Sequence, residues 1–76
     1  MSKIQKLVQS AMANPNGLSF SAFQAVMRHH GWNLDRQKGS HQIWISPSGK
    51  MLPVQDWKGK AKAYQVRQFW RMQEDE

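Results

Sequence analysis

The chain contains no cysteine, few acidic residues and no long apolar run. Without cysteine it can form neither a disulfide nor a thiolate metal site, and we expect no metal and no other cofactor. No apolar stretch approaches the roughly 18–20 residues that span a membrane. The N-terminal residues also lack the hydrophobic stretch of a signal peptide. We therefore expect a soluble, cytoplasmic protein with no membrane contact.

Acidic residues are scarce and unevenly placed along the chain. Eleven Lys and Arg face five Asp and Glu, and three of those acids are Glu74-Asp75-Glu76. The first 73 residues therefore hold eleven basic side chains and only two acidic ones. Such an excess favours a polyanionic partner, nucleic acid above all, over a basic domain that is merely soluble.

Helical spacing of apolar residues is found in three segments, 2–14, 19–30 and 63–72. Ser19 is a candidate N-cap for the second segment. Gly31 can supply the left-handed conformation that ends a helix. We therefore expect two helices before the middle of the chain and one at its end.

Between these helices the apolar pattern changes to a period of two, which is typical of strands. We expect three strands, over residues 32–37, 41–46 and 50–54. A tight turn at Lys38-Gly39 joins the first two. Pro53 cannot donate to a ladder, so it belongs at an edge or at a strand end. Residues 56–62 are expected to form a basic loop.

The order helix, helix, three antiparallel strands, helix predicts an α+β fold with helices on one sheet face. The 76 residues allow one domain. Within it, 1–16 form an extra N-terminal helix and linker, which either completes the core or contacts a partner. Residues 73–76 form an acidic tail that we expect to fray, because acids oppose the dipole at a helix C-terminus.

Gly39-Ser40-His41 opens the second expected strand, just after Arg36 and Lys38. Histidine suits proton transfer because its ordinary pKa lies near neutrality. Gly39 would let a phosphate approach the backbone, and the Ser40 hydroxyl could hold it. From spacing alone, a histidine that simply begins a half-buried strand is the more common case. The other two histidines are adjacent at a helix end and are interpreted as structural or surface residues: His29 and His30.

The expected basic loop places Lys58, Lys60 and Lys62 between small residues, and Arg67 follows on the last helix. This arrangement suits phosphate docking, although a solvated flexible loop accounts for it equally well. Trp57 stands in the loop and could stack on a base. The remaining tryptophans fit core or half-buried positions: Trp32, Trp44 and Trp70.

Two runs of this chain resemble a known family. Gly31-Trp32, then the run from Arg36 to His41 and an apolar strand, resembles the HicA-type toxins of prokaryotic toxin–antitoxin pairs. The stretch 59–68 resembles the start of the last helix in a longer HicA-like branch. The resemblance runs from about Leu18 to Trp70.

The resemblance implies a fold like the double-stranded RNA-binding domain, with a three-stranded antiparallel sheet packed on helices. It implies a metal-independent endoribonuclease that cleaves mRNA, with the strand-opening histidine as general acid or base, and this role passes to His41. It also implies a HicB-type antitoxin that covers the active site, which allows a hetero-oligomer. The residues expected to bind RNA are Arg36, Lys38, Gly39, Ser40, Gln55, Trp57, Lys58, Lys60, Lys62 and Arg67.

The chain departs from the family pattern at Pro53-Val54-Gln55, where many relatives have Pro-x-His. Gln55 cannot titrate, although its amide can hydrogen-bond RNA. Two other functions remain compatible with the sequence. One is a non-catalytic RNA-binding module of the same fold, which recognises structured RNA by shape and 2′-hydroxyl contacts. The other is a protein-interaction domain whose basic face serves an acidic partner.

Overall fold

The computed structural model describes residues 2–76, and Met1 lies outside the described residues. Its elements in chain order are α1 (Lys3–Ala13), α2 (Phe20–His29), β1 (Asn33–Lys38), β2 (His41–Ile45), β3 (Met51–Trp57), β4 (Lys60–Ala61) and α3 (Ala63–Gln73). The α+β class is confirmed. The expected count of three strands is wrong, because the antiparallel sheet has four strands in the order β1-β2-β3-β4.

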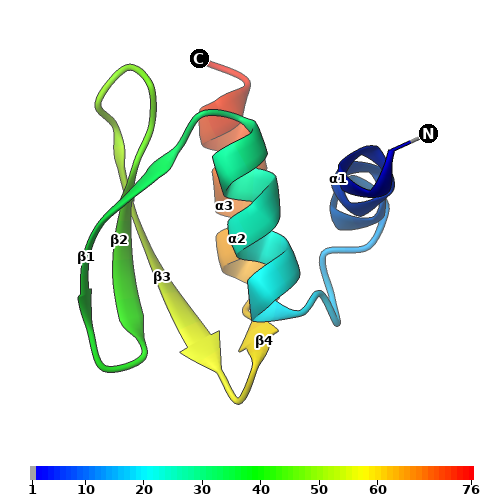
Figure 1. Cartoon of the computed structure of the whole chain (residues 1–76), viewed down its shortest axis with the longest axis horizontal. Coiled ribbons are helices and arrows are strands. Elements are labelled where there is room, and N and C mark those ends of the chain that lie inside the picture. The colour runs from blue at the N-terminus through cyan, green and yellow to red at the C-terminus, as the bar shows by residue number, and fades with distance from the viewer. Residues whose placement is uncertain (1) are drawn as a thin grey trace.

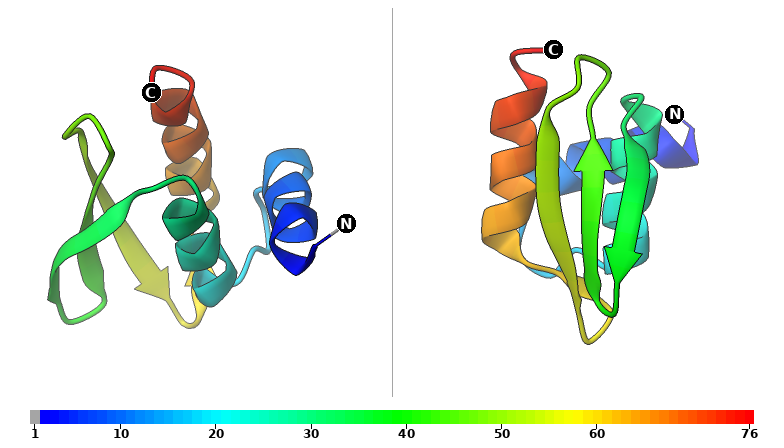
Figure 2. Two further views of the ribbon diagram at one scale, coloured as in Figure 1. Left: turned by 45° about the horizontal axis from the view of Figure 1, so that its top comes forward. Right: turned by 90° about the vertical axis from the view of Figure 1, so that its left-hand side faces the viewer.

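The elements form three layers (Figures 1 and 2). Helices α2 and α3 lie on one face of the sheet, and α1 lies across the far side of this helix pair. No helix of residues 2–76 covers the other face of the sheet, which we call the outer face. No helix of the described chain is long and apolar enough to cross a membrane.

The core lies between the sheet and the helices and centres on Phe69 of α3. Its ring centroid is 5.8 Å from that of Phe23 on α2 and 5.1 Å from that of Trp32. Ala11 of α1 is 1% exposed and joins the same cluster, and two further apolar side chains of α1 pack against it. The N-terminal helix therefore completes the core, which settles one of the two roles that the sequence left open.

Both ends of α2 follow the chemistry expected from the sequence. The Ser19 hydroxyl accepts a hydrogen bond from the Ala22 N–H at 3.1 Å, as an N-cap does. At the other end Gly31 has a φ of +84°. The Trp32 N–H then donates to the Met27 carbonyl at 3.0 Å, which satisfies a helix-end carbonyl and turns the chain toward β1.

The segment 56–62 was expected to be a loop and is instead a β-hairpin. Strand β3 continues to Trp57 and pairs with β4. The turn Lys58-Gly59 has φ values of 53° and 83°, the two positive angles that a type I′ turn requires. The Asp56 carboxylate accepts a hydrogen bond from the Gly59 N–H at 2.7 Å, which fixes this turn.

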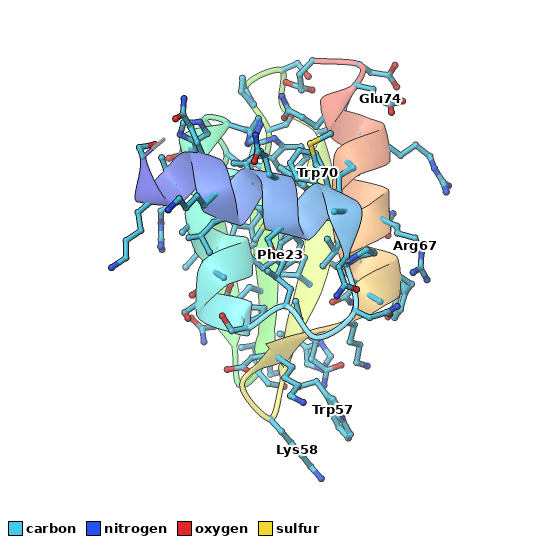
Figure 3. All side chains as sticks on the ribbon, turned by 90° about the vertical axis from the view of Figure 1, so that its right-hand side faces the viewer. Phe23, Trp57, Lys58, Arg67, Trp70 and Glu74 are labelled. Carbon is cyan, nitrogen blue, oxygen red and sulfur yellow. The ribbon has the colours of Figure 1, made fainter. Side chains whose placement is uncertain are left out.

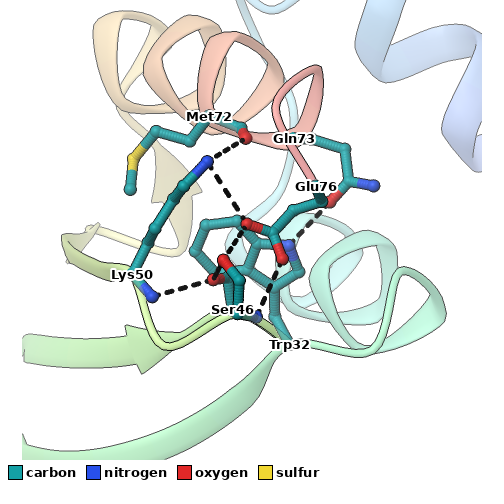
Figure 4. A network of polar contacts seen from close by, with 7 residues as sticks. Trp32, Ser46, Lys50, Met72, Gln73 and Glu76 are labelled. Atoms are coloured by element: carbon teal, nitrogen blue, oxygen red, sulfur yellow. Dashed lines mark hydrogen bonds and ion pairs between the residues drawn. The ribbon is translucent and has the colours of Figure 1, made fainter.

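The acidic end of the chain was expected to fray, but the structure holds it at Glu76 (Figure 4). The Glu76 carboxylate accepts hydrogen bonds from the Ser48 N–H at 3.0 Å and the Ser48 hydroxyl at 2.6 Å. The Lys50 ammonium lies 3.4 Å from the same group. Nearby, the Trp32 indole N–H donates to the Gln73 side-chain oxygen at 2.7 Å. These contacts join the end of α3 to the turn between β2 and β3 and to the residue before β1.

The hydroxyl of Ser48 holds the pKa of Glu76 below its ordinary value. A carboxylate with a lowered pKa stabilises the fold above its unfolded-state pKa, and this contribution is lost as the pH falls through the folded-state pKa. We therefore expect Glu76→Gln to lower the melting temperature at neutral pH, and the difference from wild type to shrink in acid. Thermal denaturation followed by circular dichroism at neutral and at acidic pH measures this difference in melting temperature.

Asp75→Asn is the matched control, because Asp75 is an exposed acid beside Glu76. It should leave both the melting temperature and its pH dependence close to wild type. A Glu76→Gln effect that is the same at neutral and acidic pH would show that the carboxylate charge does not contribute.

Candidate functional site

His41 lies in a short row of side chains across the outer face of the sheet. It pairs with Lys38 on β1 and with Gln55 on β3. Directly opposite residues point to the same face of a sheet. The next residue, Gln42, is 4% exposed and faces the helices, so the three side chains of the row face outward. We call Lys38, His41 and Gln55 the outer-face row.

Hydrogen bonding at β3 brings Gln55 close to His41. The Gln55 N–H donates to the Gln65 side-chain oxygen of α3 at 2.9 Å, so it points away from β2. His41 and Gln55 therefore form a non-hydrogen-bonded pair, the kind in which opposing side chains are closest.

The same alternation points the nitrogen of Pro53 away from β2. On that side, among residues 2–76, β3 has no partner at Pro53, because β4 pairs only with Asp56 and Trp57. Pro53 therefore lies at an edge, as expected, and interrupts no ladder.

The turn before His41 consists of Gly39 and Ser40, one residue later than expected. Gly39 has a φ of +60°, which suits glycine as the first central residue of a hairpin turn. The Ser40 hydroxyl accepts a hydrogen bond from the Gln55 side-chain amide at 3.4 Å. The Ser40 carbonyl accepts one from the Asp56 N–H at 2.9 Å. These bonds hold Ser40 against β3, beside the row.

A series of side-chain amides, the glutamine relay, connects helix α2 to this turn. The oxygen of buried Gln42 accepts hydrogen bonds from the Trp44 indole at 2.8 Å and from Gln24 of α2 at 3.1 Å. The Gln42 amide nitrogen donates to Gln37 at 3.3 Å. The Gln37 nitrogen in turn donates to the Gly39 carbonyl at 3.0 Å. The relay fixes the backbone that leads into His41.

The sequence analysis missed the relay, although it contained a signal. Gln42 and Trp44 are two residues apart and share a strand face, and Trp44 was expected at a core or half-buried position, so Gln42 had to face inward as well. A buried amide requires hydrogen-bond partners, and neighbouring glutamines are able to provide them.

The basic hairpin continues the outer face beyond the row. Trp57 lies two residues after Gln55 on β3 and therefore shares its face. Its side chain is 52% exposed. The ammonium groups of Lys58 and Lys62 lie 5.2 Å and 5.6 Å from its ring centroid, within the range of cation–π attraction. Lys60 pairs with Trp57 across the hairpin.

Two other expected RNA contacts lie in different places. Arg36 pairs with Ile43, two residues along β2 from His41, and so belongs to the outer face. Arg67 does not join this group. It lies beside Met12 and Trp70 on the side of α3 that faces α1 (Figure 3).

His30, which lies outside the row, has a structural setting. His30 Nδ1 is 2.9 Å from the Val26 carbonyl, and its ring packs edge-on against Trp70 at 5.3 Å. This confirms the structural interpretation of His30. Within residues 2–76, no group of three His, Cys, Asp or Glu side chains is placed to hold a metal ion.

The relay predicts that removing the Gln42 amide destabilises the fold. Gln42→Leu would leave the Trp44 indole and the Gln24 amide without partners, and we expect it to reduce the free energy of unfolding by about 2–3 kcal/mol. Urea denaturation measures this loss. Hydrogen exchange of the Asp56 amide, which donates to the Ser40 carbonyl, should also become faster, because the turn loses its support. Gln68→Leu, at an exposed position of α3, is the control. Equal stability of the two variants would contradict the relay.

A family model described as "HicA toxin of bacterial toxin-antitoxin" matches residues 20–73. The match begins at the first residue of α2 and ends with α3, so it contains the outer-face row and the hairpin and leaves out α1. It agrees with the resemblance noted from Leu18 to Trp70. Comparisons with curated proteins and with solved structures gave no match, so the likeness to a double-stranded RNA-binding domain stays a prediction. The chain belongs to the HicA toxin family of bacterial toxin–antitoxin systems.

Proposed function

We propose that this HicA family member is an endoribonuclease that cleaves mRNA and is neutralised by a HicB-type antitoxin. The observation that carries the proposal is the position of His41. It stands exposed on the outer face, between a lysine and a glutamine and beside a basic, aromatic hairpin. A titratable group surrounded by phosphate-binding side chains suits cleavage of a polyanion.

The chemistry requires one proton to leave and another to arrive. A neutral His41 imidazole accepts the proton of a ribose 2′-hydroxyl, and the oxygen attacks the adjacent phosphorus. The bond from phosphorus to the 5′ oxygen breaks, and that oxygen takes up a proton. One positioned acid or base contributes about 10²–10⁴ in rate. The Lys38 ammonium stabilises the negative charge that builds up on the phosphate oxygens.

The remaining outer-face residues hold the substrate. The Gln55 amide and the Ser40 hydroxyl, already 3.4 Å apart, offer donors to a phosphate beside His41. Apart from Gly39 itself and its two chain neighbours, no described residue has a heavy atom within 4 Å of the position that a Cβ on Gly39 would take, so the backbone there is open to a phosphate. Trp57 offers a face for stacking, and the lysines around it bind the phosphates that follow. Arg67 would bind only an RNA long enough to pass around α3.

His41→Ala tests the catalytic role. We expect cleavage of a labelled mRNA, incubated in a chelator, to fall by about 10²-fold or more, because the proton acceptor is gone. RNA affinity and melting temperature should stay unchanged, since the side chain is exposed. His29→Ala, which removes a histidine from outside the row, is the control.

The results separate the three functions. Full cleavage by His41→Ala would remove His41 from the mechanism. RNA binding without cleavage by the wild-type protein would indicate the non-catalytic module. No RNA binding at low salt would leave the protein-interaction domain, and cleavage that stops only in chelator would show a metal requirement.

The hairpin lysines give a second prediction. Replacing Lys58, Lys60 and Lys62 with alanine should weaken RNA binding, with little change in melting temperature. The logarithm of affinity should also depend less steeply on the logarithm of salt concentration, by about 2, because each phosphate contact to a single strand contributes about 0.7. Fluorescence anisotropy at several salt concentrations measures this slope. Lys3→Ala with Lys6→Ala, which removes two positive charges outside the hairpin, is the control, and a triple variant with the wild-type slope would show that the hairpin does not contact phosphate.

A further inference from the structure

A groove lies on the opposite side of the helix pair from His41, where the end of α1 and the following linker approach α3 (Figure 3). It is open to solvent and has a volume of about 320 Å³. It is lined by Met12, Pro15, Arg67, Trp70, Arg71 and Glu74, and we call it the α1–α3 groove.

The groove has an apolar floor that the fold leaves uncovered. Met12 is 63% exposed, whereas Ala11 beside it is 1% exposed and belongs to the core. Trp70 is half-buried, and its indole nitrogen is buried without a hydrogen-bond partner among residues 2–76. One apolar side chain of a partner would remove Met12 and the edge of Trp70 from water.

The groove also has a charged rim. Arg67 and Arg71 are four residues apart on α3 and therefore lie on the same helix face. Neither takes part in the ion pairs formed within residues 2–76. A guanidinium presents a planar set of donors that matches a carboxylate. Two such groups beside an apolar floor suit a segment that combines acidic residues with an apolar one.

We propose that the α1–α3 groove binds an acidic peptide segment with an apolar anchor, in the antitoxin partner that the family implies. A nucleic acid fits this groove less well. Glu74 lies about one turn beyond Arg71 and can accept a hydrogen bond from a peptide N–H, a donor that the phosphodiester backbone lacks. Of the lining side chains only Trp70 offers a flat ring for base stacking, and it is half-buried.

The extent of the family match is a reason to expect a partner that is specific to this chain. It begins at residue 20, so Met12 and Pro15 lie outside it and Arg67 and Arg71 lie within it. Two of the six lining residues therefore come from a segment that the family model does not include. Because the groove faces away from the outer face, this contact does not depend on the cleavage chemistry.

The test uses the full chain and a defined probe, a short acetylated and amidated peptide that alternates glutamate with leucine. Its binding is followed by proton–nitrogen NMR, in which the Trp70 indole signal reports on the groove. The matched probe replaces each glutamate with glutamine. We expect the glutamate peptide to shift the signals of Met12, Arg67 and Trp70, and the glutamine peptide to bind more weakly.

Two sets of variants identify the binding residues. Arg67→Gln with Arg71→Gln should weaken peptide binding about tenfold, since two exposed charge pairs are lost. Lys3→Gln with Lys6→Gln removes the same charge outside the groove and should leave affinity unchanged. Met12→Ser should weaken binding without lowering the melting temperature, because Met12 is exposed.

Four outcomes would overturn the proposal. They are peptide shifts on the outer face instead of the groove, equal affinity of the two double variants, and no groove shift at millimolar peptide. The fourth is a groove that responds to a single-stranded RNA or to a second copy of the chain instead of the peptide. The experiment with RNA uses the His41→Ala variant, so that the RNA is not cleaved. Analytical ultracentrifugation detects self-association of the chain. Each of these results concerns peptide binding and not cleavage. If the nuclease proposal fails, the groove proposal is unaffected, and if the groove proposal fails, the nuclease proposal is unaffected.

Discussion

A primary amide that is removed from water must find partners for its oxygen and its N–H groups, because an unpartnered polar group is costly to bury. Gln42 meets this requirement with side chains from three places. Trp44 lies on its own strand, Gln24 on α2 and Gln37 on β1. The resulting bonds fix the helix to the sheet and reach the carbonyl of Gly39. The same constraint that organises the inner face therefore sets the backbone immediately before His41.

Strand alternation carries this constraint to the outer face. Once Gln42 and Trp44 face the helices, His41 and Ile43 must face away from them. Strand β2 lies between β1 and β3, so His41 receives a neighbour on each side, whereas a residue on an edge strand would have one. Pro53 fits the same alternation, because its missing N–H points to the open edge. The site thus results from packing on the opposite face of the sheet.

The sequence predicted those parts of the structure that depend on local chemistry. Helix α2 was predictable because Ser19 and Gly31 mark its ends. The hairpin was missed because its lysines were interpreted by charge, and because Lys58-Gly59 is not among the dipeptides that favour a type I′ turn. The acidic end was expected to fray from the helix dipole alone. The contact of Glu76 with Ser48 joins residues 28 positions apart, and the helix dipole carries no information about such a contact. The side of α3 that bears Arg67 depends on which of its residues pack inward, a tertiary property.

The composition of the outer-face row limits any mechanism that uses it. A histidine in place of Gln55 would allow two titratable groups to share the proton acceptance and the proton donation. Here His41 is the one histidine of the row, and Gln55 does not exchange protons. Under the proposed cleavage, the second proton transfer therefore falls to water, which reaches the row because His41 is exposed. A site with one acid or base gains only about 10²–10⁴ in rate from proton transfer. The cations and the amide contribute substrate binding and charge stabilisation.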